Sequence, residues 1–164
     1  MNEIKKKIAL VPGSFDPFTV GHRYVAQRAA SVFDKVFVAV MINDAKQYMF
    51  TAEQRVEIAK RSLSDLTNVE VIYDGGMLVD LFDKISASAI VKGIRNGEDL
   101  AYENEMARYN LEKNPRAITL YVPSDPRVEL VSSTLVRSNS DSPELFAECI
   151  CEGARDYVLD ILKK

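Results

Sequence analysis

Residues 35–42 read Lys-Val-Phe-Val-Ala-Val-Met-Ile, a nearly continuous apolar run. Strands of a parallel sheet are covered by helices on both faces, so they are apolar throughout instead of alternating with polar residues. This run therefore predicts an inner strand of a parallel sheet. Shorter apolar runs of the same kind occur at residues 7–11, 69–73, 89–91 and 117–122.

Segments with helical spacing of apolar residues separate and follow these runs. Their ranges are 21–33, 51–66, 77–85, 98–113 and 143–164. The second begins with a capping box, Thr51 to Gln54, and carries Val56, Ala59, Leu63 and Leu66. Five strands alternating with helices predict a single α/β domain over residues 1–164. We expect a Rossmann-like, doubly wound, five-stranded parallel sheet with flanking helices and a C-terminal helix.

The composition excludes several classes of protein. The 164 residues are 47% apolar and 27% charged, an ordinary globular balance, and the net charge is −3. A mildly acidic chain is a poor candidate for a nucleic-acid binder, and no apolar segment approaches the 18 or so residues needed to span a membrane. The two cysteines, Cys149 and Cys151, are expected to be free thiols in a reducing cytoplasm.

The chain has a single histidine, His22. One histidine excludes a multi-histidine metal centre, and any Ser-His-Asp arrangement would have to use this residue. It lies at the end of the loop Pro12–His22, which follows the first predicted strand. Gly13 in this loop would let the backbone approach an anion, and a helix start near Gly21 directs free N–H groups toward the same space. His22 either adds a donor there or merely caps the helix.

The loop also carries a family motif. Gly13-Ser-Phe-Asp-Pro-x-Thr-x-Gly-His22 resembles the (T/H)-x-G-H signature of a nucleotidyltransferase superfamily. From the first strand to about Arg137, the chain resembles one family in it, the phosphopantetheine adenylyltransferases of bacterial coenzyme A synthesis. The resemblance implies an ATP-binding transferase that joins ATP to 4′-phosphopantetheine and releases dephospho-coenzyme A and pyrophosphate. The attack would be direct and in line, without a covalent enzyme intermediate.

Three later segments extend the resemblance. Lys46 precedes a Met-Phe-Thr helix start, with Gln47 where many members have a second lysine. The segment Lys92–Asn96 has lysine where the family usually has arginine, which keeps the charge but loses the forked geometry. The segment 131–137, Val-Ser-Ser-Thr-Leu-Val-Arg, matches a motif that binds ATP phosphates, although its hydroxyl groups are equally suited to cap a helix.

The family's functional residues carry over onto the matching positions. The implied catalytic residues are His22, Lys46 and Arg95. The implied phosphopantetheine-binding residues are Ser14, Lys46, Leu78 and Lys92. The implied ATP-binding residues are Ser14, Phe15, His22, Gly93, Ile94, Arg95, Glu103, Val128, Glu129, Leu130, Val131, Ser132, Ser133 and Thr134.

Further expectations come from the same resemblance. Mg²⁺ is expected on the ATP phosphates, since no carboxylate cage for a metal is evident and magnesium often relies on substrate phosphates and water. The family forms homohexamers, and coenzyme A is expected as a feedback inhibitor.

Two other functions remain open at this point. A nucleotidyltransferase acting on nicotinamide mononucleotide, or on glycerol phosphate with CTP, would commonly have histidine at the position of Thr19. A non-catalytic nucleotide sensor on the same fold would be expected to lack His22 or Lys46, and both are present. A generic α/β domain would leave four phosphate-suited loops at strand ends unexplained.

Overall fold

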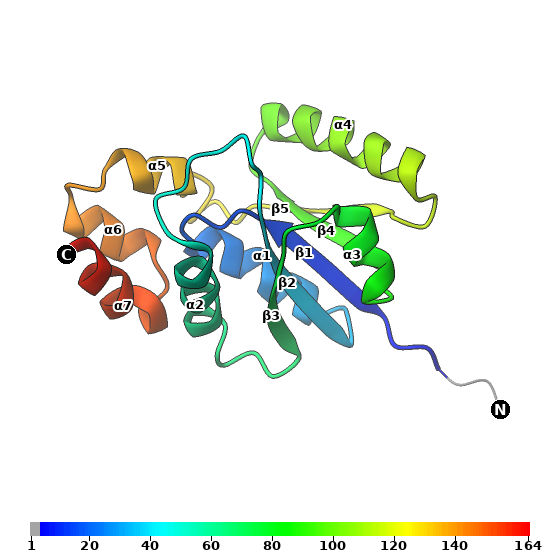
Figure 1. The fold of residues 1–164 in the computed structure, drawn as a ribbon, viewed down its shortest axis with the longest axis horizontal. Helices are drawn as coiled ribbons and strands as arrows, with labels where there is room; N and C mark the ends of the chain where they lie inside the picture. Colours follow the sequence, from blue (N-terminus) through cyan, green and yellow to red (C-terminus); the bar gives the residue numbers. More distant parts are fainter. Residues whose placement is uncertain (1–3) are drawn as a thin grey trace.

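Five parallel strands form one sheet in the order β3-β2-β1-β4-β5 (Figure 1). The computed structural model describes residues 4–164. The strands are β1 Ile8–Gly13, β2 Lys35–Met41, β3 Val69–Asp74, β4 Ala89–Ile94 and β5 Thr119–Pro123. The chain moves outward from β1 through β2 to β3, then returns to β4 on the other side of β1. This doubly wound order confirms the predicted fold and opens a crevice beyond the carboxyl ends of β1 and β4.

Seven helices surround this sheet within the described residues. They are α1 Val20–Ala30, α2 Ala52–Ser62, α3 Leu78–Lys84, α4 Gly97–Lys113, α5 Ser133–Ser138, α6 Pro143–Cys149 and α7 Glu152–Leu162. The predicted domain, residues 1–164, includes residues 1–3, which lie outside the described part of the chain. Within residues 4–164, no helix has both the length and the apolar character needed to cross a membrane.

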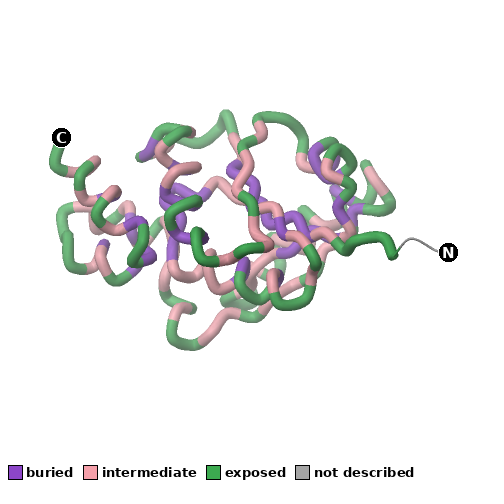
Figure 2. Tube along the Cα trace, turned by 90° about the horizontal axis from the view of Figure 1, so that it is seen from below, coloured by how far each residue is buried: buried purple, intermediate pink, exposed green. Residues whose placement is uncertain are grey.

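The apolar run of β2 belongs to two separate cores. Val38 packs in a cluster with α1, α2, α6 and α7, whereas Ala39 packs with α3 on the opposite face of the sheet. Neither residue is exposed to solvent. Figure 2 shows the buried residues concentrated in the centre of the molecule. An inner strand covered on both faces has no position left for a polar residue, which explains the pattern at residues 35–42.

The predicted C-terminal helix over residues 143–164 is wrong in one respect, because the structure divides it into α6 and α7. Ile150 has an extended backbone, with φ −96° and ψ 138°, and Cys151 precedes the first turn of α7. Cys149, Ile150 and Cys151 are all buried. Three consecutive residues cannot share one face of a continuous helix, so the break allows all three to enter the core. Both cysteines are free thiols, as predicted.

Helix α2 differs from the prediction in where it ends and in one buried residue. The helix ends at Ser62, so Leu63 and Leu66 follow it instead of continuing its apolar stripe. Its buried residues are Arg55, Ile58, Ala59 and Ser62. The capping box at Thr51 and Gln54 is present as predicted. The predicted apolar residues do face the core, since Ala59 and Leu63 are buried and Val56 and Leu66 pack against the same core cluster. The spacing did not predict the burial of Arg55, which finds carbonyl partners inside.

A glycine in α7 permits a close contact with α2. A Cβ atom at Gly153 would lie 2.7 Å from the backbone oxygen of Arg61. We therefore expect Gly153→Ala to lower the free energy of unfolding by about 1–3 kcal/mol, although alanine is the better helix former. Urea unfolding would measure this loss of stability. Gly97→Ala is the matched control, because a Cβ there meets nothing within 4 Å, and it should be neutral or stabilising. Equal stability of the two variants would contradict the proposed clash.

Candidate active site

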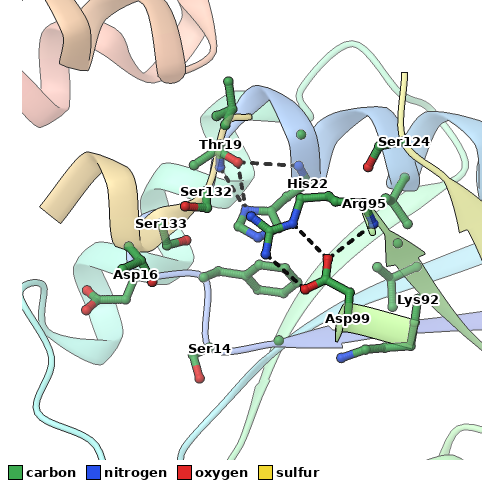
Figure 3. Close-up of a pocket in the computed structure, with 18 of the residues that line it drawn as sticks. Ser14, Asp16, Thr19, His22, Lys92, Arg95, Asp99, Ser124, Ser132 and Ser133 are labelled. Atoms are coloured by element: carbon green, nitrogen blue, oxygen red, sulfur yellow. Dashed lines mark hydrogen bonds and ion pairs between the residues drawn. The ribbon is translucent and has the colours of Figure 1, made fainter. Parts of the chain in front are cut away.

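A cavity of about 350 Å³ opens beyond the carboxyl ends of β1 and β4. Its walls come from the loop after β1, the first turn of α1, the end of β4, the first part of α4 and the start of α5 (Figure 3). Segments more than 100 residues apart in the chain therefore meet at one place. This is where a doubly wound sheet binds its ligands.

Most of the residues implied by the family resemblance line this cavity. They are Ser14, Phe15, His22, Lys46, Lys92, Gly93, Arg95, Glu103, Val128, Val131, Ser132, Ser133 and Thr134. Four others, Leu78, Ile94, Glu129 and Leu130, do not line it. Leu130 is 81% exposed. Their predicted contacts with ligands stay predictions.

His22 uses one ring nitrogen to cap its own helix. Its Nδ1 lies 3.0 Å from the backbone N of Thr19 and 3.1 Å from the Thr19 hydroxyl, while the His22 N–H approaches that hydroxyl in return (Figure 3). A backbone N–H can only donate, so Nδ1 must be an acceptor. In a neutral imidazole the proton is then on Nε2. The capping role is confirmed, and it leaves Nε2–H as a donor for a ligand.

The surroundings of His22 keep its ring neutral. The rings of Phe15 and Phe18 pack against it, with centroids 5.0 and 5.4 Å away. Burial lowers the pKa of His22 from its ordinary value of 6.5 to about 3, with further lowering by the charges of Lys92 and Arg95. At pH 7 the side chain is therefore an uncharged hydrogen-bond donor with a fixed tautomer.

This lowered pKa predicts how stability depends on pH. The folded protein keeps His22 neutral down to about pH 3, whereas the unfolded chain binds a proton below about pH 6.5. Stability from this group is therefore lost as the pH falls through this range, by up to about 1.4 kcal/mol per pH unit. Urea unfolding from about pH 7.5 to about pH 5 would show a steeper loss for the wild type than for His22→Asn. Parallel profiles would contradict the assignment.

Four cations line the cavity, namely Lys46, Lys92, Arg95 and Arg137. All but Lys46 lie within ion-pair distance of a carboxylate, and Arg137 is 3.9 Å from that of Asp16. Lys92 at the end of β4 lies 3.2 Å from Oε1 of Glu103. The guanidinium of Arg95 donates to both oxygens of Asp99, at 2.8 and 3.1 Å. These hydrogen bonds hold the pKa of the Asp99 carboxyl below its usual range. Glu103 and Asp99 both come from α4, which therefore orients Lys92 and Arg95 before any ligand binds.

Lys46 is exposed and belongs to the loop after β2. Its Nζ lies 3.5 Å from the hydroxyl oxygen of Ser14 in the loop after β1. No ion pair involves it among residues 4–164. Lys46 is therefore available to an anion without first leaving a carboxylate.

The start of α5 offers backbone groups more than hydroxyl groups. Ser132 is the N-cap, and its hydroxyl accepts from the Leu135 N–H at 3.0 Å, which confirms the capping alternative. The hydroxyl of Ser133 donates to the Pro17 carbonyl at 2.8 Å. Because both side chains have partners in the protein, the groups left for a ligand are the free N–H groups of the first turn.

Two glycines in the wall have a steric role that sequence reasoning did not anticipate. A Cβ at Gly13 would lie 2.7 Å from Cε1 of Phe15, and a Cβ at Gly93 would lie 2.6 Å from Cγ2 of Val25. Both glycines therefore admit a neighbouring side chain as well as lining the cavity. Phe15 itself has a φ of 51°, which is uncommon for a residue with a side chain.

Sequence reasoning missed the role of Asp16 in shaping the site. This carboxylate is 2% exposed and accepts hydrogen bonds from the backbone N–H groups of Met49 and Phe50, both at 2.9 Å. Arg137 from α5 donates to the Asp16 carbonyl at 2.7 Å. Asp16 thus joins the loops after β1 and β2 to α5. The available signal was an aspartate that precedes a proline inside the motif Gly13–His22.

A smaller cavity of about 110 Å³ lies beside the first. It is lined by Leu78, Ile90, Lys92, Tyr102, Glu103, Met106, Ala107, Asn110 and Thr119. Lys92 and Glu103 line both cavities, so their ion pair forms a shared wall. The structure therefore places Leu78 and Lys92 in the lining of the same smaller cavity, with Leu78 outside the larger one.

Comparisons with known proteins identify the family of this chain. A family model described as cytidylyltransferase-like matches residues 10–139. A phosphopantetheine adenylyltransferase of Caldanaerobacter subterraneus is 40% identical over 156 residues, which cover 95% of each chain. That of Lactobacillus acidophilus is 44% identical over 131 residues, covering 79% of this chain and 81% of the other.

A solved structure shows the same fold at much lower identity. The bifunctional NMN adenylyltransferase/ADP ribose pyrophosphatase of Francisella tularensis is 17% identical, with a TM-score of 0.74, over 98% of this chain and 51% of the other. At this identity the likeness concerns the fold alone. The sequence relatives, at 40% and 44% identity, define the family more narrowly. The chain belongs to the cytidylyltransferase-like family and, within it, to the phosphopantetheine adenylyltransferases.

Proposed function

We propose that this protein transfers the adenylyl group of ATP to 4′-phosphopantetheine, giving dephospho-coenzyme A and pyrophosphate. The name shared by its relatives supports this reaction. The observation that carries the proposal is the pair of adjoining cavities with Lys92 in their common wall. The larger, cation-lined cavity suits a polyphosphate, and the smaller one, with Leu78 and Met106, suits a slender and partly apolar arm.

The reaction proposed is a direct in-line displacement. A phosphate oxygen of phosphopantetheine attacks the α-phosphorus of ATP, a new P–O bond forms, and the bond to the pyrophosphate oxygen breaks. The second pKa of a phosphate monoester is about 6, so the nucleophile is already largely a dianion at pH 7. It needs no general base, and it is not routed through a covalent enzyme intermediate.

The protein's task is then to hold two anions together and stabilise the charge that develops between them. The neutral Nε2–H of His22 is proposed to donate to an oxygen around the α-phosphate. Lys46 and Arg95 are proposed to contact phosphate oxygens, and Ser14 to position the attacking phosphate. Such groups act mainly by positioning and by electrostatic stabilisation.

Mg²⁺ is proposed to enter with the nucleotide instead of occupying a protein cage. The carboxylates that line the larger cavity are Asp16, Asp99 and Glu103, and each is engaged by backbone amides, Arg95 or Lys92. Among residues 4–164 there is no group of three or more metal-ligating side chains. The residues present fit a magnesium ion held by phosphates and water, which neutralises phosphate charge when bound.

Assembly, regulation and location are further parts of the proposal. We propose a homohexamer, supported by exposed apolar side chains on α4 and β5, among them Leu100, Tyr109 and Leu120. Coenzyme A is proposed as a feedback inhibitor, because it contains both the pantetheine arm and an adenine nucleotide. A cytoplasmic location is supported by the two buried free thiols. Light scattering and product inhibition would test the first two.

A reverse assay tests the reaction. Dephospho-coenzyme A and pyrophosphate should yield ATP, measured by luminescence. Parallel reactions contain nicotinamide adenine dinucleotide or CDP-glycerol in place of dephospho-coenzyme A. If a nucleoside triphosphate forms only from nicotinamide adenine dinucleotide or only from CDP-glycerol, the protein is another nucleotidyltransferase. If none of the three reactions yields a nucleoside triphosphate, a nucleotide sensor is favoured. Thr19 occupies the position where those transferases commonly have histidine, and here it caps α1.

A further inference from the structure

One arginine is buried beside the larger cavity without forming part of its lining. Arg55 on α2 is 1% exposed, the largest side chain among the fully buried ones. Its Nη1 donates to the carbonyl of Ser14 at 2.6 Å and to that of Met41 at 3.2 Å. Its guanidinium lies 4.0 Å from the centroid of the Tyr48 ring. Arg55 therefore contacts the ends of β1 and β2, whose loops carry Ser14 and Lys46.

The charge of Arg55 has no carboxylate within ion-pair distance in the described part of the chain, and the acid on which it is seen to act, Glu53 on the same helix, is exposed to solvent. Buried arginines are normally paired, because removing an unpaired charge from water is costly. Among residues 4–164 no ion pair includes Arg55. The buried carboxylate of Asp16 instead accepts from two backbone amides and lies 3.9 Å from Arg137. The Nε of Arg55 also lacks a hydrogen-bond partner. The free-energy cost of burying this charge must be offset by a favourable interaction elsewhere.

The peptide group that Arg55 holds belongs to the wall of the cavity. Ser14 and Phe15 both line that wall, and the peptide bond between them is trans. In a trans peptide the N–H is directed opposite to the carbonyl. With the Ser14 carbonyl held by Arg55, the Phe15 N–H is turned away from Arg55, and it donates to no acceptor among residues 4–164.

We propose that Arg55 is a positioning residue for anion binding, whose unpaired charge acts on a polyanionic ligand through the Ser14–Phe15 peptide. The anion supplies a counter-charge across this peptide, in surroundings where charges interact more strongly than in water. The inference rests on the proposed function for the identity of the ligand as ATP. A purely structural alternative is that Arg55 only ties β1 to β2.

Binding by calorimetry to a charge-graded series separates these roles. The ligands are adenosine, AMP, ADP and ATP without Mg²⁺, which share one nucleoside and differ in negative charge. Arg55→Gln keeps a donor but removes the charge, and Arg55→Lys keeps the charge. Lys60→Gln removes one charge from an exposed position on the same helix and is the control.

The proposal gives a distinct pattern across this series. For Arg55→Gln we expect ATP to bind at least about tenfold more weakly, AMP to lose less and adenosine to bind within about twofold of the wild type. Because Arg55→Lys keeps the charge, it should bind all four ligands within about threefold of the wild type. Lys60→Gln should bind them as the wild type does.

Other outcomes overturn the proposal. Equal losses for all four ligands, adenosine included, would leave Arg55 a structural tie, and so would unchanged ATP binding by folded Arg55→Gln. If Arg55→Gln does not fold, Arg55→Lys decides, and a loss of ATP affinity beyond about tenfold in that folded variant refutes the role of charge. The binding measurements do not depend on turnover. If the adenylyl-transfer assay fails but the four ligands bind in the expected pattern, the proposed reaction is rejected and the role of Arg55 is kept. A wild type that binds ATP no better than adenosine would reject both.

Discussion

Replacing His22 with alanine should lower kcat at least about a hundredfold while leaving the Kd for ATP within about threefold of the wild type. The lost group is a neutral donor, Nε2–H, whose tautomer is set by the hydrogen bond from Thr19 to Nδ1. A donor placed to meet charge that develops in the transition state contributes about 2.7–4 kcal/mol to the barrier and little to ground-state binding. Steady-state kinetics of the reverse reaction, with calorimetry for ATP, would measure both quantities.

A matched pair of variants separates the two nitrogens of His22. Asparagine can place an acceptor near the position of Nδ1 and preserve the cap on Thr19, but it has no group at Nε2. Glutamine can place an N–H₂ group near Nε2. We therefore expect His22→Asn to remain folded and lose as much activity as alanine, and His22→Gln to retain more. Near-normal turnover of the asparagine variant would refute the catalytic role and leave His22 a helix cap.

Replacing Lys46 with methionine should also lower kcat at least about a hundredfold, by removing the cation that has no carboxylate partner. The side chain is exposed and lies 3.5 Å from the Ser14 hydroxyl, so the change should leave the melting temperature nearly unaltered. Thermal unfolding and steady-state kinetics, run on the same preparation, would measure both.

Moving the lysine by one residue tests whether position or charge matters. The double variant Lys46→Gln with Gln47→Lys keeps the net charge of the loop and changes only the residue that carries it. Many members of the family have lysine at both positions, so the loop should tolerate the change. We expect this variant to be as inactive as Lys46→Met. Recovery to within about tenfold of the wild type would show that Lys46 only adds to the local potential.

Much of the fold could be predicted because its signals are local. The apolar run of β2 and the capping box at Thr51 each depend on a few neighbouring residues. The division of residues 143–164 into α6 and α7 could not be predicted in this way. Its cause is the packing of Cys149, Ile150 and Cys151 against elements far away in the chain, and helical spacing contains no information about that packing.

The site, like the fold, has features that local sequence predicts and features that it does not. The pattern from Gly13 to His22 was sufficient to indicate a phosphate-binding loop and a family, because spacing within one loop is a local property. The resemblance also indicated which other loops belong with it. It did not predict the pairing of Lys92 with Glu103 or the Asp16 contacts. Such contacts join groups from different elements, and they form only when the strand order brings those elements together.

Arg55 shows most clearly what could not be predicted from the sequence. In the sequence it is one charged residue in a helix, where an exposed position is the natural expectation. The fold places it between β1 and β2, where two backbone carbonyls and the Tyr48 ring enclose it with no carboxylate within ion-pair distance among residues 4–164. Local pattern thus specified the strands, the loops and the type of chemistry. The burial, pairing and tautomer of individual charged groups followed from packing, because desolvation and charge–charge interactions depend on distances in three dimensions.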